Sequence, residues 1–271
     1  MIKSTFGITK EPFLRRDHNL LTQQKEIIDI ITIHAQQGGF SVVVGQPGVG
    51  KSVLREHIEG FSKERDTVVI SVSRTMHTYM NILKQLCDAF KINPKKTQVE
   101  TELINEAYKP IKERKTLYIL IDEAHLLDML VLRKLRLLFD KFPKQHNLVL
   151  FGQSELFHQL SLTVNDDIKS RITYSKALIP LNDEDLESVI YHELDTVWLG
   201  HHTFNEAAAA LILRSAQGNL RLCRNLCYGS LIEACRDGKK QVTTEHVNRI
   251  LIQPHWRSHD ELIKQQVATA S

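Results

Sequence analysis

Long apolar runs are the first thing that this 271-residue chain lacks. No stretch reaches the ~18 apolar residues that cross a bilayer as a helix, so we expect no membrane span. The first residues, MIKSTFGITKEPF, have no continuous apolar segment of the kind that a secretory signal peptide carries. We therefore expect a cytoplasmic protein without a membrane partner.

Cysteines are few, and neither sign of charge is in large excess. Of the four cysteines, Cys223 and Cys227 lie in an apolar helical run, and none forms a CxxC pair. We interpret them as reduced residues that pack helices, not as metal ligands. The formal net charge is only +3 and the pI about 8.6, which permits nucleic-acid binding without requiring it. Internal repeats and low-complexity segments are also missing.

What is present is an alternation of apolar strands and helices. Five strands are predicted at 40–45, 67–73, 117–122, 147–152 and 171–179. Helices are predicted between them, including one over 125–142 with leucines at helical spacing. Strands that alternate with helices indicate an α/β fold with a five-stranded parallel sheet and right-handed crossovers.

Strands stop after Pro180, and capped helices follow. Asn205 is placed to cap a helix that Gly218 ends, and Gly238 is placed to end the next one. We therefore divide the chain into an α/β core with its irregular lead-in (1–180), a helical domain (181–254) and a tail (255–271).

The string GQPGVGKS at 45–52 fits G-x-x-x-x-G-K-[ST] at every fixed position. Its glycines let backbone N–H groups face phosphate oxygens, and the helix that follows adds its positive end. Lys51 is predicted to reach the β- and γ-phosphates, and the Ser52 hydroxyl to bind Mg²⁺. A chance glycine turn is the alternative, but the loop stands between a valine-rich strand and a helix, as the motif requires. The predicted nucleotide contacts here are Gly45, Gln46, Pro47, Gly48, Val49, Gly50, Lys51, Ser52 and Val53.

A second motif, LYILIDEAH (117–125), ends an apolar strand in two acids. Asp122 is predicted to hold Mg²⁺, and Glu123 to orient and deprotonate the attacking water. The alternative is a solvated acidic pair in a turn. His125 completes the letters DEAH, which are shared with one helicase class, but this chain is too short for the two cores of such a helicase. We interpret His125 as a neighbour of the site and not a catalyst.

Three more polar residues are candidates for the site. Gln153 follows the fourth strand, between the acids and the expected γ-phosphate, and could contact that phosphate or position water. Arg171 begins the predicted fifth strand and could reach a neighbouring subunit's nucleotide; a surface arginine near Asp166 and Asp167 is the alternative. Arg221, in GNLR, could fold over the nucleotide from the helical domain, or be a surface charge.

Taken in order, these residues resemble an AAA+ ATPase over about residues 5–252. Lys51 would stand in Walker A, Asp122 and Glu123 in Walker B, Gln153 at sensor 1, Arg171 as an arginine finger and Arg221 at sensor 2. Within that superfamily the chain is similar to the ExeA/GspA-type ATPases and the related TniB, TnsC and MuB transposition ATPases. Strings that carry this likeness include FGITKEPF, FGQSEL, PLNDEDLESVIYHEL and GNLRLCRNL.

The resemblance implies ATP and Mg²⁺ as cofactors and an ATP-dependent homo-oligomer, either a ring or a helical filament. It implies a C-terminal helical lid and an adenine that packs near Phe6, Gly7 and Phe13. The chain departs from the pattern at Gln153, where many relatives carry Asn, Thr or Ser, and at Glu193, where Arg is expected.

The resemblance leaves two functions in competition. ExeA-type proteins join such an ATPase to a membrane span and a wall-binding region, neither of which we see in this sequence. We therefore expect a transposition regulator that binds duplex DNA with ATP and recruits a DDE transposase or adaptor, with a secretion ATPase as the alternative. The predicted DNA contacts are Arg74, His77, Thr78 and Lys84, and a second set is Arg133, Lys134 and Arg136. A solvated helix face is the alternative for both sets.

Overall fold

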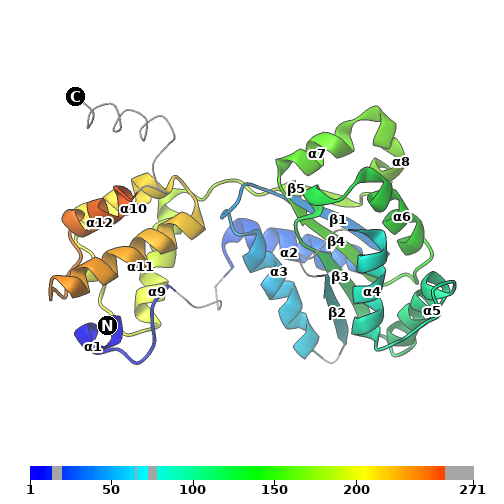
Figure 1. Cartoon of the computed structure of the whole chain (residues 1–271), viewed down its shortest axis with the longest axis horizontal. Coiled ribbons are helices and arrows are strands. Elements are labelled where there is room, and N and C mark those ends of the chain that lie inside the picture. The colour runs from blue at the N-terminus through cyan, green and yellow to red at the C-terminus, as the bar shows by residue number, and fades with distance from the viewer. Residues whose placement is uncertain (14–19, 65, 73–77, 254–271) are drawn as a thin grey trace. The chain divides into compact units, whose positions relative to one another are not determined.

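The structure, a computed structural model, describes residues 1–13, 20–64, 66–72 and 78–253. The chain forms two compact units. One, His18–Ile179, is the α/β unit, and the other joins Met1–Asp17 to Pro180–Ser271 and is the helical unit. The lead-in, which we predicted with the α/β core, thus groups with the C-terminal helices (Figure 1).

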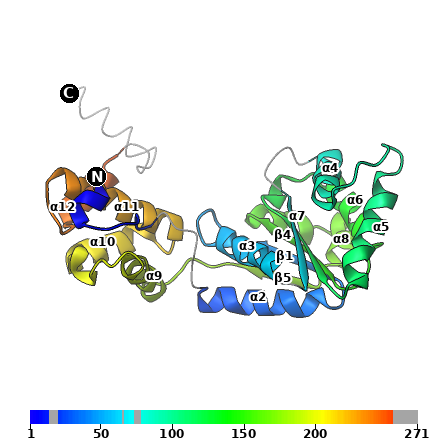
Figure 2. The same ribbon diagram turned by 90° about the horizontal axis from the view of Figure 1, so that it is seen from below.

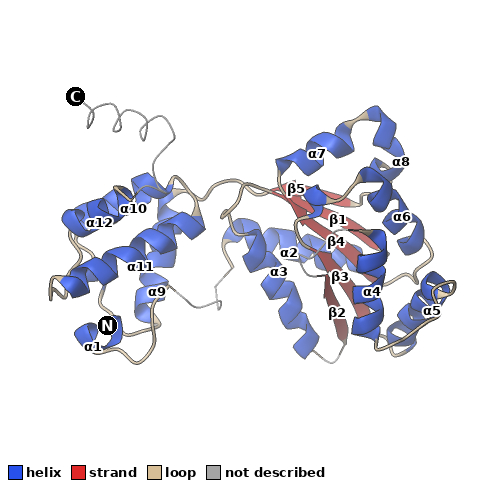
Figure 3. Ribbon diagram, viewed as in Figure 1, coloured by secondary structure: helices blue, strands red, loops and turns tan. Residues whose placement is uncertain are grey.

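Five parallel strands form the sheet of the α/β unit, in the order β2-β3-β4-β1-β5. The fold class predicted from the sequence is confirmed, and Figure 3 shows the strands in red. Their bounds are β1 Gly39–Val44, β2 Thr67–Val72, β3 Thr116–Ile121, β4 His146–Gly152 and β5 Tyr174–Ala177.

Side chains of the central strands alternate between two cores because successive residues of a strand face opposite sides. Val42 and Val44 of β1 lie in one core with helices α4 to α8, whereas Val43 lies in the other with α2 and α3. Figure 2 shows these helix layers on the two faces of the sheet. The helices of this unit are α2 Thr22–Ala35, α3 Lys51–Gly60, α4 Tyr79–Phe90, α5 Val99–Lys112, α6 Met129–Phe139, α7 Ser154–Ser161 and α8 Asp166–Lys169.

Two predicted elements have different bounds in the structure. The single helix expected over 125–142 is instead a 3₁₀ turn, Ala124–Leu126, followed by α6. Asp128 causes the break, because its carboxylate accepts a hydrogen bond from Leu130 N at 3.0 Å and so starts a new helix. The fifth strand begins at Tyr174 and not at Arg171, because the polar segment before it folds into α8 and a turn.

Among its described residues the helical unit contains four longer α-helices and a short one. They are α1 Ile2–Phe6, α9 Asp183–Asp195, α10 Glu206–Ala216, α11 Leu220–Arg236 and α12 Thr244–Leu251. Asn182, Asn205 and Asn219 cap three of them, each accepting a backbone hydrogen bond with its side-chain oxygen. In the part of the chain that the structure describes, none of the helices combines the length and apolar character that crossing a bilayer demands.

A buried ion pair ties the lead-in to this unit. Glu193, which is 3% exposed, pairs with Arg224 and also accepts a hydrogen bond from Phe13 N at 3.1 Å, across 180 residues of sequence. The Phe13 ring packs edge-on against Phe204. A buried charge that loses its partner costs on the order of 3–5 kcal/mol, so the departure from Arg at position 193 has a structural role here.

Candidate active site

The phosphate-binding loop joins the end of β1 to the start of α3. Its backbone needs glycine: Gly48 has φ 89° and Gly50 has φ 109°, where a side chain is strained. A β-carbon at Gly50 would also lie 2.6 Å from Gln24 Nε2, and one at Gly45 would lie 2.8 Å from Val49 Cγ2. The loop is thus shaped as a close backbone cradle, which suits a phosphate chain.

Lys51, the first residue of α3, bends back over this loop. Its ammonium donates to the carbonyl oxygens of Gly45 at 2.5 Å and Gln46 at 3.0 Å. Ser52 follows in the first turn of the same helix, whose N–H groups lack helical partners. These two side chains and the helix end supply the cation, hydroxyl and N–H donors that a magnesium–triphosphate complex needs.

The two predicted acids stand directly after β3. Asp122 is 5% exposed and accepts a hydrogen bond from Glu123 N at 2.9 Å. Its other carboxylate oxygen lies 3.5 Å from Nε of Arg55 on α3, so the metal-ligand candidate is tied to the helix that begins with Lys51. Because β1 and β3 are parallel and flank β4, the loop and the acids meet at the carboxyl edge of one sheet. Oxygen ligands from Ser52 and Asp122 fit Mg²⁺.

Gln153 stands between these two groups because β4 lies between β1 and β3. Its side chain contacts His125, with 3.0 Å between Gln153 Nε2 and His125 Nε2. The other ring nitrogen, His125 Nδ1, lies 3.5 Å from Glu123 Oε2. Sequence reasoning placed His125 near the site and missed these contacts, although the spacing Glu-x-His was visible.

Arg171 lies in the α/β unit at the amino edge of the sheet, in the turn that precedes β5. Its Nε is 3.8 Å from Asp140 Oδ2, and its side chain is 54% exposed. It lines a cavity of about 410 Å³ together with Arg136 and Lys144. Its ion-pair partner is therefore Asp140 and not Asp166 or Asp167, and its own phosphate-binding loop lies at the opposite edge of the same parallel sheet.

The other predicted nucleotide contacts belong to the helical unit. Arg221 lies in the first turn of α11, Phe6 ends α1, and Gly7 adopts φ 70° directly after it. Phe13 is buried beside Phe204. Contacts of these four residues with adenine or phosphate stay predictions.

The first predicted set of DNA contacts divides into two pairs. Arg74 and His77 lie outside the described residues. Thr78 caps α4 by accepting from Asn81 N at 3.4 Å, and Lys84 is exposed on the same helix.

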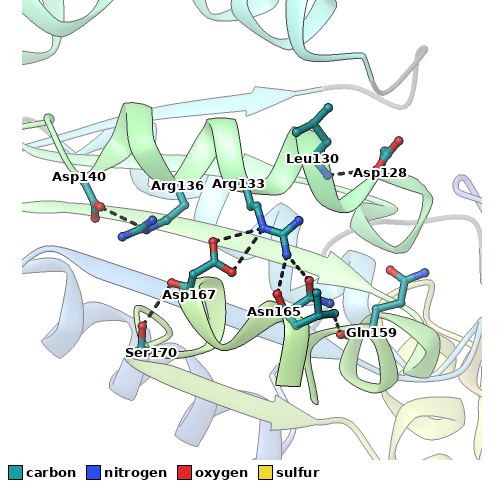
Figure 4. Close-up of polar contacts among 10 residues, drawn as sticks. Asp128, Leu130, Arg133, Arg136, Asp140, Gln159, Asn165, Asp167 and Ser170 are labelled. Atoms are coloured by element: carbon teal, nitrogen blue, oxygen red, sulfur yellow. Dashed lines mark hydrogen bonds and ion pairs between the residues drawn. The ribbon is translucent and has the colours of Figure 1, made fainter. Parts of the chain in front are cut away.

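Arg133, of the second predicted DNA-contact set, is engaged within the protein. It donates to Val164 O and Asn165 Oδ1, both at 2.7 Å, and pairs with Asp167 at 3.3 Å (Figure 4). Arg136 pairs with Asp140 at 3.3 Å. The contacts of Arg133 tie α6 to the segment before β5, whereas that of Arg136 lies within the end of α6. They favour a structural role for these two arginines over phosphate contacts.

Comparisons with known proteins agree with this geometry. Residues 33–160, which include the loop, the acids and Gln153, match the family described as AAA domain. The chain is 27% identical over 214 residues to general secretion pathway protein A of Aeromonas hydrophila, a match that covers 76% of this chain and 39% of that protein.

Solved structures share the fold at low sequence identity. Cdc6p of Pyrobaculum aerophilum superposes with TM-score 0.70 at 16% identity, covering 89% of this chain and 68% of that one. ORC1 of Aeropyrum pernix in complex with DNA gives TM-score 0.67 at 14% identity, covering 88% and 67%. The RuvB branch-migration motor of Thermotoga maritima gives TM-score 0.52 at 14% identity, covering 88% and 72%. At these identities the likeness shows a shared fold, an α/β unit with a five-stranded parallel sheet.

Proposed function

We propose that this chain is a magnesium-dependent ATPase that assembles on duplex DNA, as a ring or filament, and recruits a DDE transposase or its adaptor. The observation that carries the ATPase is the meeting of Lys51, Asp122, Glu123 and Gln153 at one edge of the sheet. We propose that the protein works in the cytoplasm, because ATP and duplex DNA are available there.

In the proposed hydrolysis, each of these side chains has a role that its position allows. Lys51 would exchange its loop carbonyls for the β- and γ-phosphate oxygens. Ser52 and Asp122 would hold Mg²⁺, which offsets phosphate charge when bound. Glu123 would take a proton from water as the water oxygen bonds to the γ-phosphorus and the bond from phosphorus to the leaving oxygen breaks.

Arg171 supports a site that is shared between subunits. It lies at the amino edge of the sheet, whereas the phosphate-binding loop of the same α/β unit lies at the carboxyl edge. An arginine in that place is available to a second copy's γ-phosphate, where it would stabilise the charge of the transition state. Arg221 and the lead-in residues Phe6, Gly7 and Phe13 remain our proposed further contacts of the nucleotide.

DNA is proposed as the surface on which the copies assemble. The chain carries a small positive excess, and an archaeal ORC1 with the same fold was solved in complex with DNA. Arg74, His77, Thr78 and Lys84 remain our proposed phosphate contacts.

A secretion role is the second candidate. The 27% identity to general secretion pathway protein A favours it, although the match spans only 39% of that protein. In this role the same ATPase cycle would drive the assembly of a secretion apparatus, without DNA.

Nucleotide-dependent DNA binding separates the two candidates. We would measure the fluorescence anisotropy of labelled duplex DNA with ATP, a slowly hydrolysed analogue, ADP or no nucleotide, and image the complexes by electron microscopy. We expect binding with ATP and the analogue only, with affinity that falls linearly on a log–log plot against salt.

The Lys51→Ala variant is the control and should bind no DNA in any nucleotide state. ATP hydrolysis without nucleotide-dependent DNA binding would contradict the transposition role and favour the secretion role. Absence of both hydrolysis and nucleotide binding would contradict the ATPase itself.

A further inference from the structure

His125 lies between two residues of the site and contacts both. On one side Gln153 Nε2 is 3.0 Å from His125 Nε2, and on the other His125 Nδ1 is 3.5 Å from Glu123 Oε2. The imidazole is only 11% exposed, and its Nδ1 is buried without a hydrogen-bond partner. The imidazole is therefore largely buried, with one nitrogen engaged by Gln153 and the other facing the proposed general base.

The backbone brings the three side chains together. Glu123 adopts the left-handed conformation with φ 53°, and the turn Ala124–Leu126 then carries His125 back toward β4. Gly152 lets the strand end approach this turn, because a β-carbon there would lie 3.3 Å from His125 N and 3.0 Å from Leu156 Cδ2. The contacts thus depend on backbone geometry at two neighbouring strands, not on a chance rotamer.

The chemistry of the imidazole suits a link between an amide and a carboxylate. If the Gln153 amide donates, His125 Nε2 accepts, and the proton of the neutral ring lies on Nδ1. That N–H then faces Glu123 Oε2 across 3.5 Å, which is slightly longer than a hydrogen bond. A shift of a few tenths of an ångström would close the bond and turn the carboxylate.

We propose that His125 is a positioning residue that couples Gln153 to Glu123. When the Gln153 side chain contacts a γ-phosphate, its amide moves relative to the His125 ring. The imidazole moves with it and orients the Glu123 carboxylate toward the attacking water. The inference rests on the proposed ATPase and is independent of DNA. From the sequence alone, His125 was only a neighbour of the acids.

The test is a set of single and double variants assayed for steady-state ATP hydrolysis. His125→Ala should lower kcat on the order of tenfold or more with little change in KM, because it disturbs the base and not the binding of ATP. Gln153→Ala should also lower kcat, but it should add nothing in the His125→Ala background, because the two act through one path.

His125→Asn tests the link itself. Its amide can keep a donor near Glu123, but it is too short to reach Gln153. We expect part of the lost kcat to return, while Gln153→Ala remains without effect in that background. His158→Ala, at an exposed histidine on α7, is the matched control and should retain wild-type kcat.

Binding of a fluorescent ATP analogue and a thermal melt are recorded for every variant. Additive effects of His125→Ala and Gln153→Ala, or a raised KM with unchanged kcat, would overturn the coupling. Should His125→Ala fail to fold, additivity of Gln153→Ala in the His125→Asn background would overturn it equally. A wild-type protein that binds no ATP would instead contradict the proposed function.

Discussion

Glu123 combines a left-handed backbone conformation with a position beside His125. Its φ of 53° lies in the left-handed region that side chains adopt rarely, at a cost of order 1–3 kcal/mol. The carboxylate is held near the ring of His125, and the backbone N–H of the residue is held by Asp122. Such strain persists where the surrounding structure fixes it, which is consistent with a functional residue.

Glu123→Gln tests the role of this carboxylate without changing its size. We expect ATP binding to be retained and kcat to fall by roughly 10²–10⁴-fold, because a neutral amide cannot take the proton of water. Single-turnover hydrolysis and binding of a fluorescent analogue measure the two effects separately. Hydrolysis at the wild-type rate would show that another group is the base.

At the scale of elements, the end of β1 and the start of α3 determine the site. Strand β1 lies between β4 and β5, and the phosphate-binding loop begins where it ends. The loop turns at two glycines with positive φ, and the first turn of α3 follows it directly. The geometry is local, which is why its sequence motif identified it.

Gly50→Ala and Gly60→Ala form a matched pair at the two ends of α3. Gly50→Ala should weaken ATP binding at least tenfold and lower the melting temperature, because φ 109° and the contact with Gln24 both reject a β-carbon. Gly60, with φ −61°, has open space around it. Gly60→Ala should therefore stabilise the protein by ~0.5–1 kcal/mol and leave ATP binding unchanged.

Calorimetric titration with ATP and thermal melts provide both readouts. Wild-type ATP affinity in the Gly50→Ala variant would contradict the proposed cradle.

Local sequence patterns predicted much of this arrangement, but they did not predict contacts between residues that are distant in sequence. Walker-type motifs, alternating strands and helix caps act within a few residues, so the loop, the acids and most element types could be predicted. The contact of Gln153 with His125 depends on the pairing of β3 with β4, which no local pattern specifies. The break before α6 was missed because leucine periodicity continues through Asp128.

The packing of the lead-in also depends on contacts between residues that are distant in sequence, which local patterns do not predict. Its packing depends on Glu193, which lies 180 residues from Phe13, and an isolated glutamate gives no signal of a buried partner. We assigned the lead-in to the α/β core, within residues 1–180. The structure groups them with the helices that follow it.

At the scale of the whole molecule, we propose that two copies share one site. Lys51 and Glu123 would form one half of that site, and Arg171, at the other edge of the sheet, would form the other half. A neighbouring exposed cation, Lys169, offers a matched control on the same surface. Arg171→Ala should lower kcat by ~10³-fold or more, whereas Lys169→Ala should retain wild-type activity.

Mixing two defective variants tests whether two copies share one site. Lys51→Ala and Arg171→Ala proteins, each nearly inactive alone, are combined in equal amounts with ATP, and hydrolysis is measured. We predict activity well above the sum of the two, because an Arg171→Ala copy supplies an intact loop and a Lys51→Ala copy supplies the arginine. A mixture of Lys51→Ala with Glu123→Gln, both defective in the same half, should recover much less. If the first mixture shows no gain, the shared site is contradicted.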